Sequence, residues 1–357
     1  MSYYQTMASD HNLKQLVEQI RGWGAELGFA HTAISDIDLK DAEAKLNIWL
    51  DKKFHGEMSY MESHDTKRTR PEELVPGTIR VITVRMNYLT QSMSRASEIL
   101  QNPDKAYISR YALGRDYHKV LRSRLQKLAD KIQNATGPLG YRAFCDSAPV
   151  MEKSLAEKSG QGWLGKHANI INRHSGSWFF LGELYTDLPL PADQPTTNHC
   201  GSCNACIDVC PTQAIVAPYV VDARRCISYH TIELHSAIPV EFRKAMGNRI
   251  YGCDDCQLVC PWNRYAELST ELDFEARHSL DDISLVELFS WNETRFLSKM
   301  EGSPIRRIGH TKWLRNIAVA LGNARTSKSV IDALNSRKND PSELVREHVL
   351  WALSQHI

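Results

Sequence analysis

Long hydrophobic runs are absent from this sequence of 357 residues: no apolar stretch approaches the ~20 residues that a membrane-spanning helix requires. An excess of one charge is absent as well, because 43 Lys and Arg residues oppose 42 Asp and Glu residues. The resulting formal net charge of +1 excludes a globally basic protein, so any contact with nucleic acid must come from local patches. The N-terminal segment has neither a charged-then-apolar signal pattern nor a twin arginine, which predicts that the chain is not exported.

Cysteine is scarce outside one short region, since eight of the nine cysteines lie between positions 200 and 260. Residues 200–211 read C-x2-C-x2-C-x3-C-P, the spacing with which bacterial ferredoxins hold a 4Fe-4S cluster. Residues 253–261 read C-x2-C-x3-C-P, which repeats the last three cysteines of the same motif. The sequence therefore predicts two 4Fe-4S clusters and electron transfer. Reduced thiolates of this kind favour a cytoplasmic location.

The spacing also predicts which cysteines share a cluster, because the fourth cysteine of each ferredoxin run binds the other cluster. The first cluster is expected to use Cys200, Cys203, Cys206 and Cys260. The second is expected to use Cys210, Cys226, Cys253 and Cys256, where Cys226 is the only other cysteine of the region. An insertion of 26 residues, 227–252, then separates the first two ligands of the second run.

Zinc is the alternative occupant, because paired C-x2-C motifs also build tetrahedral zinc sites. Such sites combine two well-separated pairs, whereas here three cysteines recur at three-residue spacing and each run ends in Cys-Pro. Both features favour iron–sulfur clusters. Structural disulfides are disfavoured by the same spacing and by the lack of a secretion signal.

The chain is expected to divide into three parts, 1–190, 191–270 and 271–357. In the first part, helical spacing over 13–20 and 117–132 alternates with strand-like runs at 80–85 and 178–181, which predicts an α/β domain. Three prolines between 189 and 195 mark its end. The second part holds the ferredoxin-like module.

The third part is expected to be helical. Its segments 313–321 and 345–353 align with an offset of 32 residues, a weak self-similarity of the kind that stacked helix pairs show. The predicted fold class is therefore mixed, α+β or α/β, followed by α-helical HEAT-like repeats. A plain helical bundle is the alternative for the C-terminal part.

Five longer segments carry a family resemblance: residues 110–118, 162–166, 177–183, 226–234 and 247–263. In these segments the chain resembles the epoxyqueuosine reductases, a family related to reductive dehalogenases. The resemblance implies reduction of epoxyqueuosine to queuosine at the wobble base of tRNA, the last step of queuosine biosynthesis. It also implies base-off cobalamin beside the two 4Fe-4S clusters, and cobalamin rests on the resemblance alone.

The implied chemistry needs both an electron store and an acid. Removing an epoxide oxygen as water takes two electrons and two protons, while iron–sulfur clusters supply electrons singly; Co(I) of a corrin can store a pair. Asp146 matches the family's proposed proton donor, and burial beside a corrin is expected to raise the pKa of its carboxyl. Without the resemblance, Asp146 is read as the cap of a helix that begins near Met151.

Weaker expectations concern the cofactors. The family match implies cobalamin contacts from Arg68, Asn169, Ile170 and Tyr229, together with Asp146. The cluster of Cys210, Cys226, Cys253 and Cys256 is expected to lie nearer the corrin, since residues 227–252 join it to the family's Ile-Ser-Tyr signature. The ninth cysteine, Cys145, is read as a small buried hydrophobe rather than a reactive thiol.

The tRNA is expected to meet a basic cluster without intervening acids: Arg306, Arg307, Lys312 and Arg315. Such residues contact phosphates and position RNA without reading its sequence, although a solvated helix face is the usual fate of a charge run. A low-potential flavodoxin or ferredoxin is the expected electron donor, and the chain is expected to act as a monomer. The alternatives are a reductive dehalogenase-like enzyme and a two-cluster electron carrier without chemistry of its own.

Overall fold

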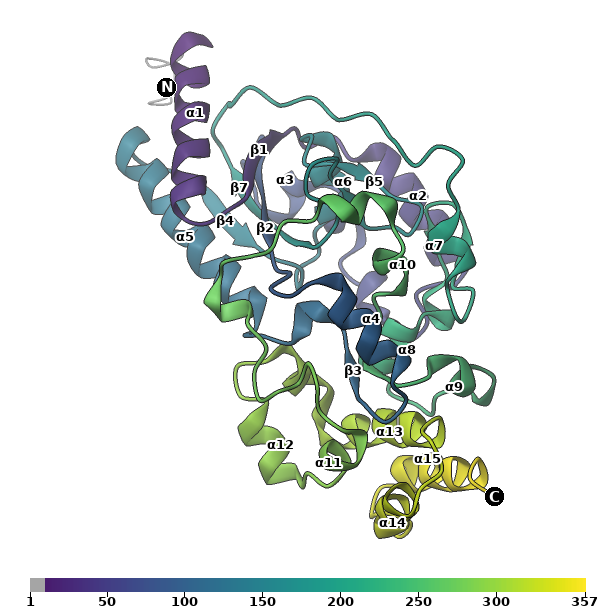
Figure 1. Cartoon of the computed structure of the whole chain (residues 1–357). Coiled ribbons are helices and arrows are strands. Elements are labelled where there is room, and N and C mark those ends of the chain that lie inside the picture. Colours follow the sequence, from purple (N-terminus) through teal and green to yellow (C-terminus); the bar gives the residue numbers. More distant parts are fainter. Residues whose placement is uncertain (1–9) are drawn as a thin grey trace.

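The computed structural model describes residues 10–357, so the N-terminal segment on which the export prediction rests lies largely outside the described residues. A four-stranded sheet forms the centre of the N-terminal part (Figure 1). Its strands follow the order β1 (His31–Ser35), β2 (Arg80–Asn87), β7 (Phe179–Thr186) and β4 (Tyr141–Phe144). Every neighbouring pair is antiparallel. The N-terminal part is therefore α+β, and the expected α/β domain is wrong in this respect.

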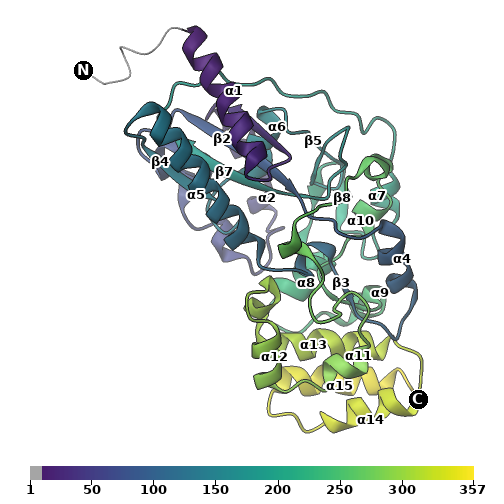
Figure 2. The same cartoon turned by 60° about the vertical axis from the view of Figure 1, so that its left-hand side comes forward.

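Helices cover both faces of this sheet. Helices α1 (Asp10–Glu26) and α5 (Tyr117–Thr136) lie side by side on one face, as Figure 2 shows. They bury the apolar side chains of alternate strand residues, among them Ile82 and Val84. Helix α6 (Glu152–Lys158) packs against β1, β2 and β7 from the opposite face. The strand at 80–85 and the helix at 117–132 are confirmed, and both extend beyond the predicted ends.

Shorter elements complete this part. They are α2 (Lys40–Asp51), α3 (Pro71–Leu74), α4 (Met93–Gln101), β3 (Tyr107–Ile108), β5 (Trp163–Leu164) and β6 (Ile170–Ile171). Strands β5 and β6 pair with each other in an antiparallel hairpin. The loop between them and the segment after β6 border the three cavities described below.

The cysteine-rich part consists of short helices and strands. They are α7 (Ala205–Asp208), β8 (Ile215–Ala217), β9 (Val220–Val221), α8 (Ile227–Ile232), α9 (Val240–Met246), β10 (Arg249–Tyr251) and α10 (Asp255–Leu258). Helices α7 and α10 pack together, and each begins just before one cysteine of its run, Cys206 or Cys256. The two cysteine runs therefore have the same local structure, with one short helix in each.

A parallel pair and a buried carboxylate fasten the cysteine-rich part to the first part. Strand β10 pairs with β3, and Asp254 accepts hydrogen bonds from Tyr107 Oη at 2.7 Å, Ser109 Oγ at 2.5 Å and the Arg110 backbone N–H at 2.8 Å. Each bond to a buried carboxylate is charge-assisted, so removing one partner weakens the compensation of a buried charge. The strand pair and the Asp254 hydrogen bonds thus fix the position of the two cysteine-rich helices relative to the sheet domain.

The C-terminal part is helical, as predicted. It contains α11 (Leu285–Phe289), α12 (Glu293–Lys299), α13 (Gly309–Gly322), α14 (Lys328–Ser336) and α15 (Glu343–Ser354). Helices α13 and α15, which hold the two segments offset by 32 residues, pack against each other, and their apolar core includes Ala106 and Ile108. The repeat architecture and the boundaries at 190 and 270 stay predictions. Among residues 10–357, no helix has the length and apolar character needed to cross a bilayer.

Candidate active site

A cavity of about 470 Å³ opens between the sheet, the loop after β4 and the cysteine-rich part. Its volume is in the range of small-molecule sites, ~300–1,000 Å³. The lining joins apolar side chains, including Ile170, Phe179 and Leu181, to the titratable residues Asp146 and Glu152. Cys253 lines it too, beside Asp254. A cysteine thiol and titratable carboxyls therefore share one space.

Asp146 reaches this cavity from a loop rather than capping a helix. Helix α6 begins at Glu152 with Met151 as its N-cap, and no side chain bonds to the cap, so the capping interpretation is wrong. Asp146 has a φ of 54°, in the left-handed region that non-glycine residues rarely adopt. Its side chain is 51% exposed, toward the cavity that it lines.

A relay of polar groups leads from the surface to Asp146. The Asp146 carboxylate accepts hydrogen bonds from Tyr117 Oη and, at 3.2 Å, from His118 Nε2. The other ring nitrogen of His118 bonds to Asp116 Oδ1 at 2.7 Å, and Arg307 donates to Asp116 Oδ2 at 2.6 Å. A protonated His118 can donate to both carboxylates, and the Arg307 guanidinium also lies 3.2 Å from its Nδ1.

The pKa values follow from this relay. Burial of His118 lowers its pKa, but the hydrogen bonds to Asp116 and Asp146 outweigh burial and raise the pKa above its usual value. Burial in the cavity raises the pKa of Asp146, yet the hydrogen bonds from His118 and Tyr117, with the charges of His118 and Lys153, lower it overall. In the protein alone the relay thus stabilises the Asp146 carboxylate, and the upward pKa shift expected beside a bound corrin stays a prediction.

Two further carboxyls near Asp146 were not found from the sequence. Burial and the charge of Asp146 raise the pKa of Glu152, which begins α6, to about 7. Burial and the charges of Glu152 and Asp146 raise the pKa of Glu183, on β7, well above its usual value. Neither carboxyl oxygen of Glu183 has a hydrogen-bond partner among the described residues. Three carboxyls with divergent pKa values thus lie together, an arrangement typical of catalytic sites. The position of Glu183 near Asp146 follows only from the pairing of β7 with its neighbouring strands, which the sequence does not show.

The cysteines divide between two places. Cys200, Cys203, Cys206 and Cys260 line one small cavity beside α7, together with Lys166 and Trp262. Cys226, Cys206 and Cys210 lie near enough to Cys256 for their charges to add to burial in raising its pKa, and Cys253 lines the larger cavity. None of the nine cysteines is in a disulfide. Within residues 10–357, no three His, Cys, Asp or Glu side chains converge on a single metal ion.

The cofactor residues expected from the sequence lie in different settings. Asn169 and Ile170 line the large cavity, but Arg68 and Tyr229 do not belong to its lining. Arg68 is buried and donates to the Tyr60 carbonyl at 2.7 Å, while Tyr229 Oη accepts from the Glu57 backbone N–H at 2.8 Å. Cys145 is fully buried with its Sγ 3.5 Å from the Leu181 carbonyl.

The expected basic cluster is corrected at one position. Arg315 is fully buried in α13 and donates to the carbonyls of Leu234, Ser236 and His230, so it cannot meet a phosphate. Its position in the sequence gave no sign of these acceptors, which come from a distant segment of the chain. Lys312 donates to the Ile232 carbonyl at 3.0 Å. Arg306 is exposed, and Arg307, which is half exposed, ends the relay that reaches Asp146.

An α+β domain whose cavity joins a proton relay to a two-run cysteine module defines an iron–sulfur oxidoreductase. The comparisons with known proteins specify the kind. The sequence profile "4Fe-4S double cluster binding domain" matches residues 199–263, and "Epoxyqueuosine reductase QueG, DUF1730" matches residues 68–147. The chain is 57% identical to the epoxyqueuosine reductase of Pseudomonas aeruginosa over 96% of this chain and 95% of that protein. It is 58% identical to that of Escherichia coli, over 98% and 92%.

Solved structures agree with the sequence comparisons. A crystal structure of a selenomethionine-labelled epoxyqueuosine reductase matches with a TM-score of 0.87 and 26% identity, over 96% of this chain and 91% of that chain. Another, of an epoxyqueuosine reductase with an epoxyqueuosine-modified tRNA-Tyr stem loop, matches with a TM-score of 0.84 and 27% identity, over the same shares. The chain belongs to the epoxyqueuosine reductase family. It is an oxidoreductase that acts on tRNA in queuosine biosynthesis, which replaces both alternative functions.

Proposed function

We propose that the large cavity holds base-off cobalamin and the reacting epoxide, and that the eight cysteines hold two 4Fe-4S clusters that feed electrons toward it. The observation that carries this proposal is that Asp146, at the end of a proton relay, and Cys253 line the same cavity. The overall change is balanced: an epoxide, two electrons and two protons give an alkene and water. Bound cobalamin would supply a two-electron-reduced, strongly nucleophilic cobalt.

The lining fits such a cofactor. Ile170, Phe179 and Leu181 offer apolar surface for a flat macrocycle, while Asn169 and Ser228 can bond to amides at its edge. Cys200, Cys203, Cys206 and Cys260 are proposed as ligands of the first cluster, and Cys210, Cys226, Cys253 and Cys256 as ligands of the second. Because Cys253 lines the cavity, the second cluster is the one proposed to lie nearer the corrin. Arg68 and Tyr229, which lie outside the lining, are proposed to support the residues that line the cavity rather than to bind the cofactor directly.

Asp146 is proposed as the group that protonates the departing oxygen. Its carboxylate is stabilised by His118 and Tyr117, and His118 can pass it a proton along the hydrogen bond from Nε2. Asp116 favours the protonated form of His118 and orients its ring, which makes Asp116 a positioning residue. The left-handed backbone at Asp146 aims the carboxyl into the cavity.

The direct test of the activity is nucleoside mass spectrometry. The protein, loaded with iron, sulfide and cobalamin and kept anaerobic with a low-potential reductant, is incubated with tRNA carrying epoxyqueuosine. We expect nucleosides lighter by one oxygen, and no change in tRNA that already carries queuosine. Epoxyqueuosine left intact by fully loaded protein would refute the proposed function.

Replacing Asp116 by asparagine is expected to move the alkaline limb of the kcat/KM profile to lower pH. The Asp116 carboxylate raises the His118 pKa. Without it, His118 loses its proton at lower pH, and the relay then has no proton to pass to Asp146. Asparagine caps helices about as well as aspartate does, so the start of α5 is expected to stay folded. The pH profile of kcat/KM measures the shift, and an unmoved alkaline limb would show that Asp116 has no part in the proton supply.

The C-terminal helices are proposed to hold the tRNA, in line with their HEAT-like sequence pattern. Arg306 and Arg307 are exposed beside the start of α13, which suits contacts to phosphates, and the half-buried Lys312 lies nearby. Charge reversal by Arg306→Glu is expected to weaken tRNA binding by about tenfold and to flatten its salt dependence, with little change in the cluster spectra. Fluorescence anisotropy at several salt concentrations measures both. Equal affinity of variant and parent would remove Arg306 from the tRNA surface. A monomer is the proposed oligomeric state.

A further inference from the structure

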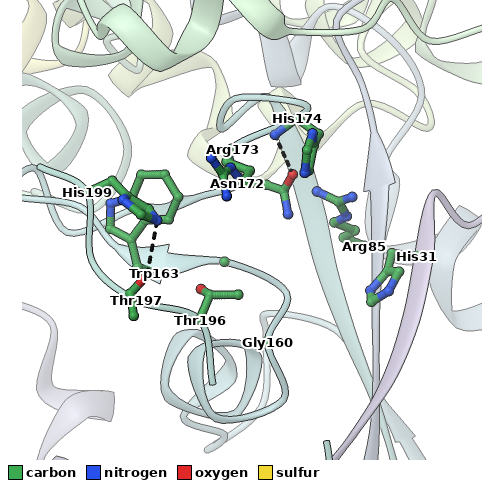
Figure 3. A pocket seen from close by; sticks show the side chains of 11 residues that line it. His31, Arg85, Gly160, Trp163, Asn172, Arg173, His174, Thr196, Thr197 and His199 are labelled. Atoms are coloured by element: carbon green, nitrogen blue, oxygen red, sulfur yellow. Dashed lines mark hydrogen bonds between the residues drawn. The ribbon is translucent and has the colours of Figure 1, made fainter. Parts of the chain in front are cut away.

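A second cavity of about 430 Å³ lies beside the first cysteine quartet and is not used by the proposed chemistry (Figure 3). Its walls come from β1, β2, the loop before β5, the turn after β6 and the segment that leads to Cys200. His31 and Arg85 are cross-strand partners in the sheet, so their side chains leave it on the same face. The side chains that Figure 3 labels surround a common space.

The lining of this cavity is basic. Five of its residues carry basic side chains, and none of the described lining residues is Asp or Glu; the five are His31, Arg85, Arg173, His174 and His199. Arg173 and His174 are exposed at the tip of the turn. The two arginines therefore give the cavity a local positive charge in a chain whose formal net charge is only +1.

Among the basic residues of this lining, Arg85 has the strongest electrostatic preference for a bound anion. Its side chain is only 8% exposed, and it forms no ion pair with any residue of the described range 10–357. Its Nη1 donates to Ser175 Oγ at 2.6 Å, its guanidinium lies 5.5 Å from the Phe179 ring centre, and its Nε has no partner in that range. Burial lowers the pKa of Arg85 to about 10, so it is still charged at neutral pH. The charge of Glu267 raises this pKa without a direct ion pair, so the buried guanidinium is only partly compensated, and an incoming carboxylate would relieve the remaining cost.

Aromatic residues also connect this cavity with the first cysteine quartet. Trp163, which lines it, has its ring 5.0 Å from the His199 ring and 5.1 Å from the Trp262 ring. Trp163 shares one apolar cluster with Cys200, Cys260 and Trp262. The large cavity, by contrast, is bordered by Cys253 of the other quartet. The substrate cavity and the basic cavity thus lie next to different cysteine quartets.

We infer that this basic cavity and its rim dock an acidic electron-transfer protein, one surface carboxylate of which pairs with Arg85 while others meet Arg173 and His174. The inference rests on the proposed function, because it assigns the Cys200, Cys203, Cys206 and Cys260 cluster as the point of electron entry. In each encounter the donor is oxidised by one electron and the cluster is reduced by one, and no proton or atom moves. Two encounters supply the two electrons that one epoxide needs.

The test uses cluster-loaded protein and the exposed charge reversal Arg173→Glu. Stopped-flow absorbance follows cluster reduction by reduced ferredoxin, which offers carboxylates alone, and by reduced flavodoxin, which adds a flavin phosphate. We expect the second-order rate constant at low salt to fall at least tenfold with both donors and the difference to shrink at high salt. Reduction by dithionite and the binding of cobalamin are expected to stay unchanged. Calorimetry with oxidised ferredoxin, which needs no turnover, is expected to show weaker binding.

Lys127→Glu is the matched control, because Lys127 is exposed on α5, across the sheet from the cavity. Equal losses in the two variants, unchanged rates in Arg173→Glu, or a loss confined to flavodoxin would each overturn the inference. So would weaker cobalamin binding in Arg173→Glu or in Arg85→Gln, since the cavity would then belong to the cofactor site. A slower donor reaction in protein that fails to reduce epoxyqueuosine would support the docking surface and refute only the proposed function.

Discussion

Replacing Asp146 by asparagine is expected to lower single-turnover formation of queuosine in tRNA by roughly 10²–10⁴-fold, the usual contribution of a general acid. The amide keeps the size of the carboxyl but cannot pass a proton from His118 to the departing oxygen. Asp146 lines the cavity with half of its side chain exposed, so the substitution leaves no fully buried charge unpaired. Cobalamin binding, measured by the optical spectrum, is expected to change little.

Asp130→Asn is the control for this experiment, because Asp130 is exposed on α5 and its carboxylate accepts a hydrogen bond from Gln126 on the same helix. It makes the same chemical change at a distance from the cavity and is expected to leave the rate unaltered. If Asp146→Asn turned over epoxyqueuosine at the parent rate, the proton would have to come from another group. Glu152, whose pKa of about 7 places it near the working pH, would be the first residue to test.

Replacing Cys226 by alanine is expected to abolish reduction of the bound corrin while leaving the corrin bound. The substitution removes one of the four proposed ligands of the cluster nearer the cavity, and the iron content is expected to fall below about eight per chain. Cys226 itself is not part of the cavity lining, so the cofactor should still fit. Electron paramagnetic resonance under reducing conditions distinguishes cobalt that stays as Co(II) from cobalt that is reduced further.

The ninth cysteine supplies the matched control. Cys145→Ala removes a buried thiol that lies outside both quartets, so the iron content is expected to stay at that of the parent. Normal turnover by the Cys226→Ala variant would contradict the assigned ligand set. A full iron content in that variant would contradict it as well.

Local patterns in the sequence predicted the elements that position the site. Helical spacing found α5, and apolar runs found β2 and β7, because these periods are set by burial along a single element. The cysteine spacing alone separated the two quartets, and in the folded chain Cys200, Cys203, Cys206 and Cys260 line one cavity. The assignment of these cysteines as ligands stays a prediction.

Features that depend on contacts between distant segments could not be predicted from the sequence. Strand direction is set by connections, so alternating helices and strands suggested α/β where the sheet is antiparallel. The charge pattern predicted Arg315 as a surface cation, whereas the carbonyls of Leu234, Ser236 and His230 enclose it. The pKa of Asp146 in the protein alone depends on His118 and Tyr117 from another element, and nothing in the sequence indicated these contacts.

The central claim is that one chain combines two clusters with a corrin in the cavity beside Asp146. Metal analysis together with electron paramagnetic resonance, on anaerobic protein incubated with cobalamin, tests it most directly. The account predicts about eight irons and one cobalt per chain, with a base-off Co(II) signal. Eight irons without bound cobalt would contradict it, since the cavity would then lack the group that the proposed reduction requires.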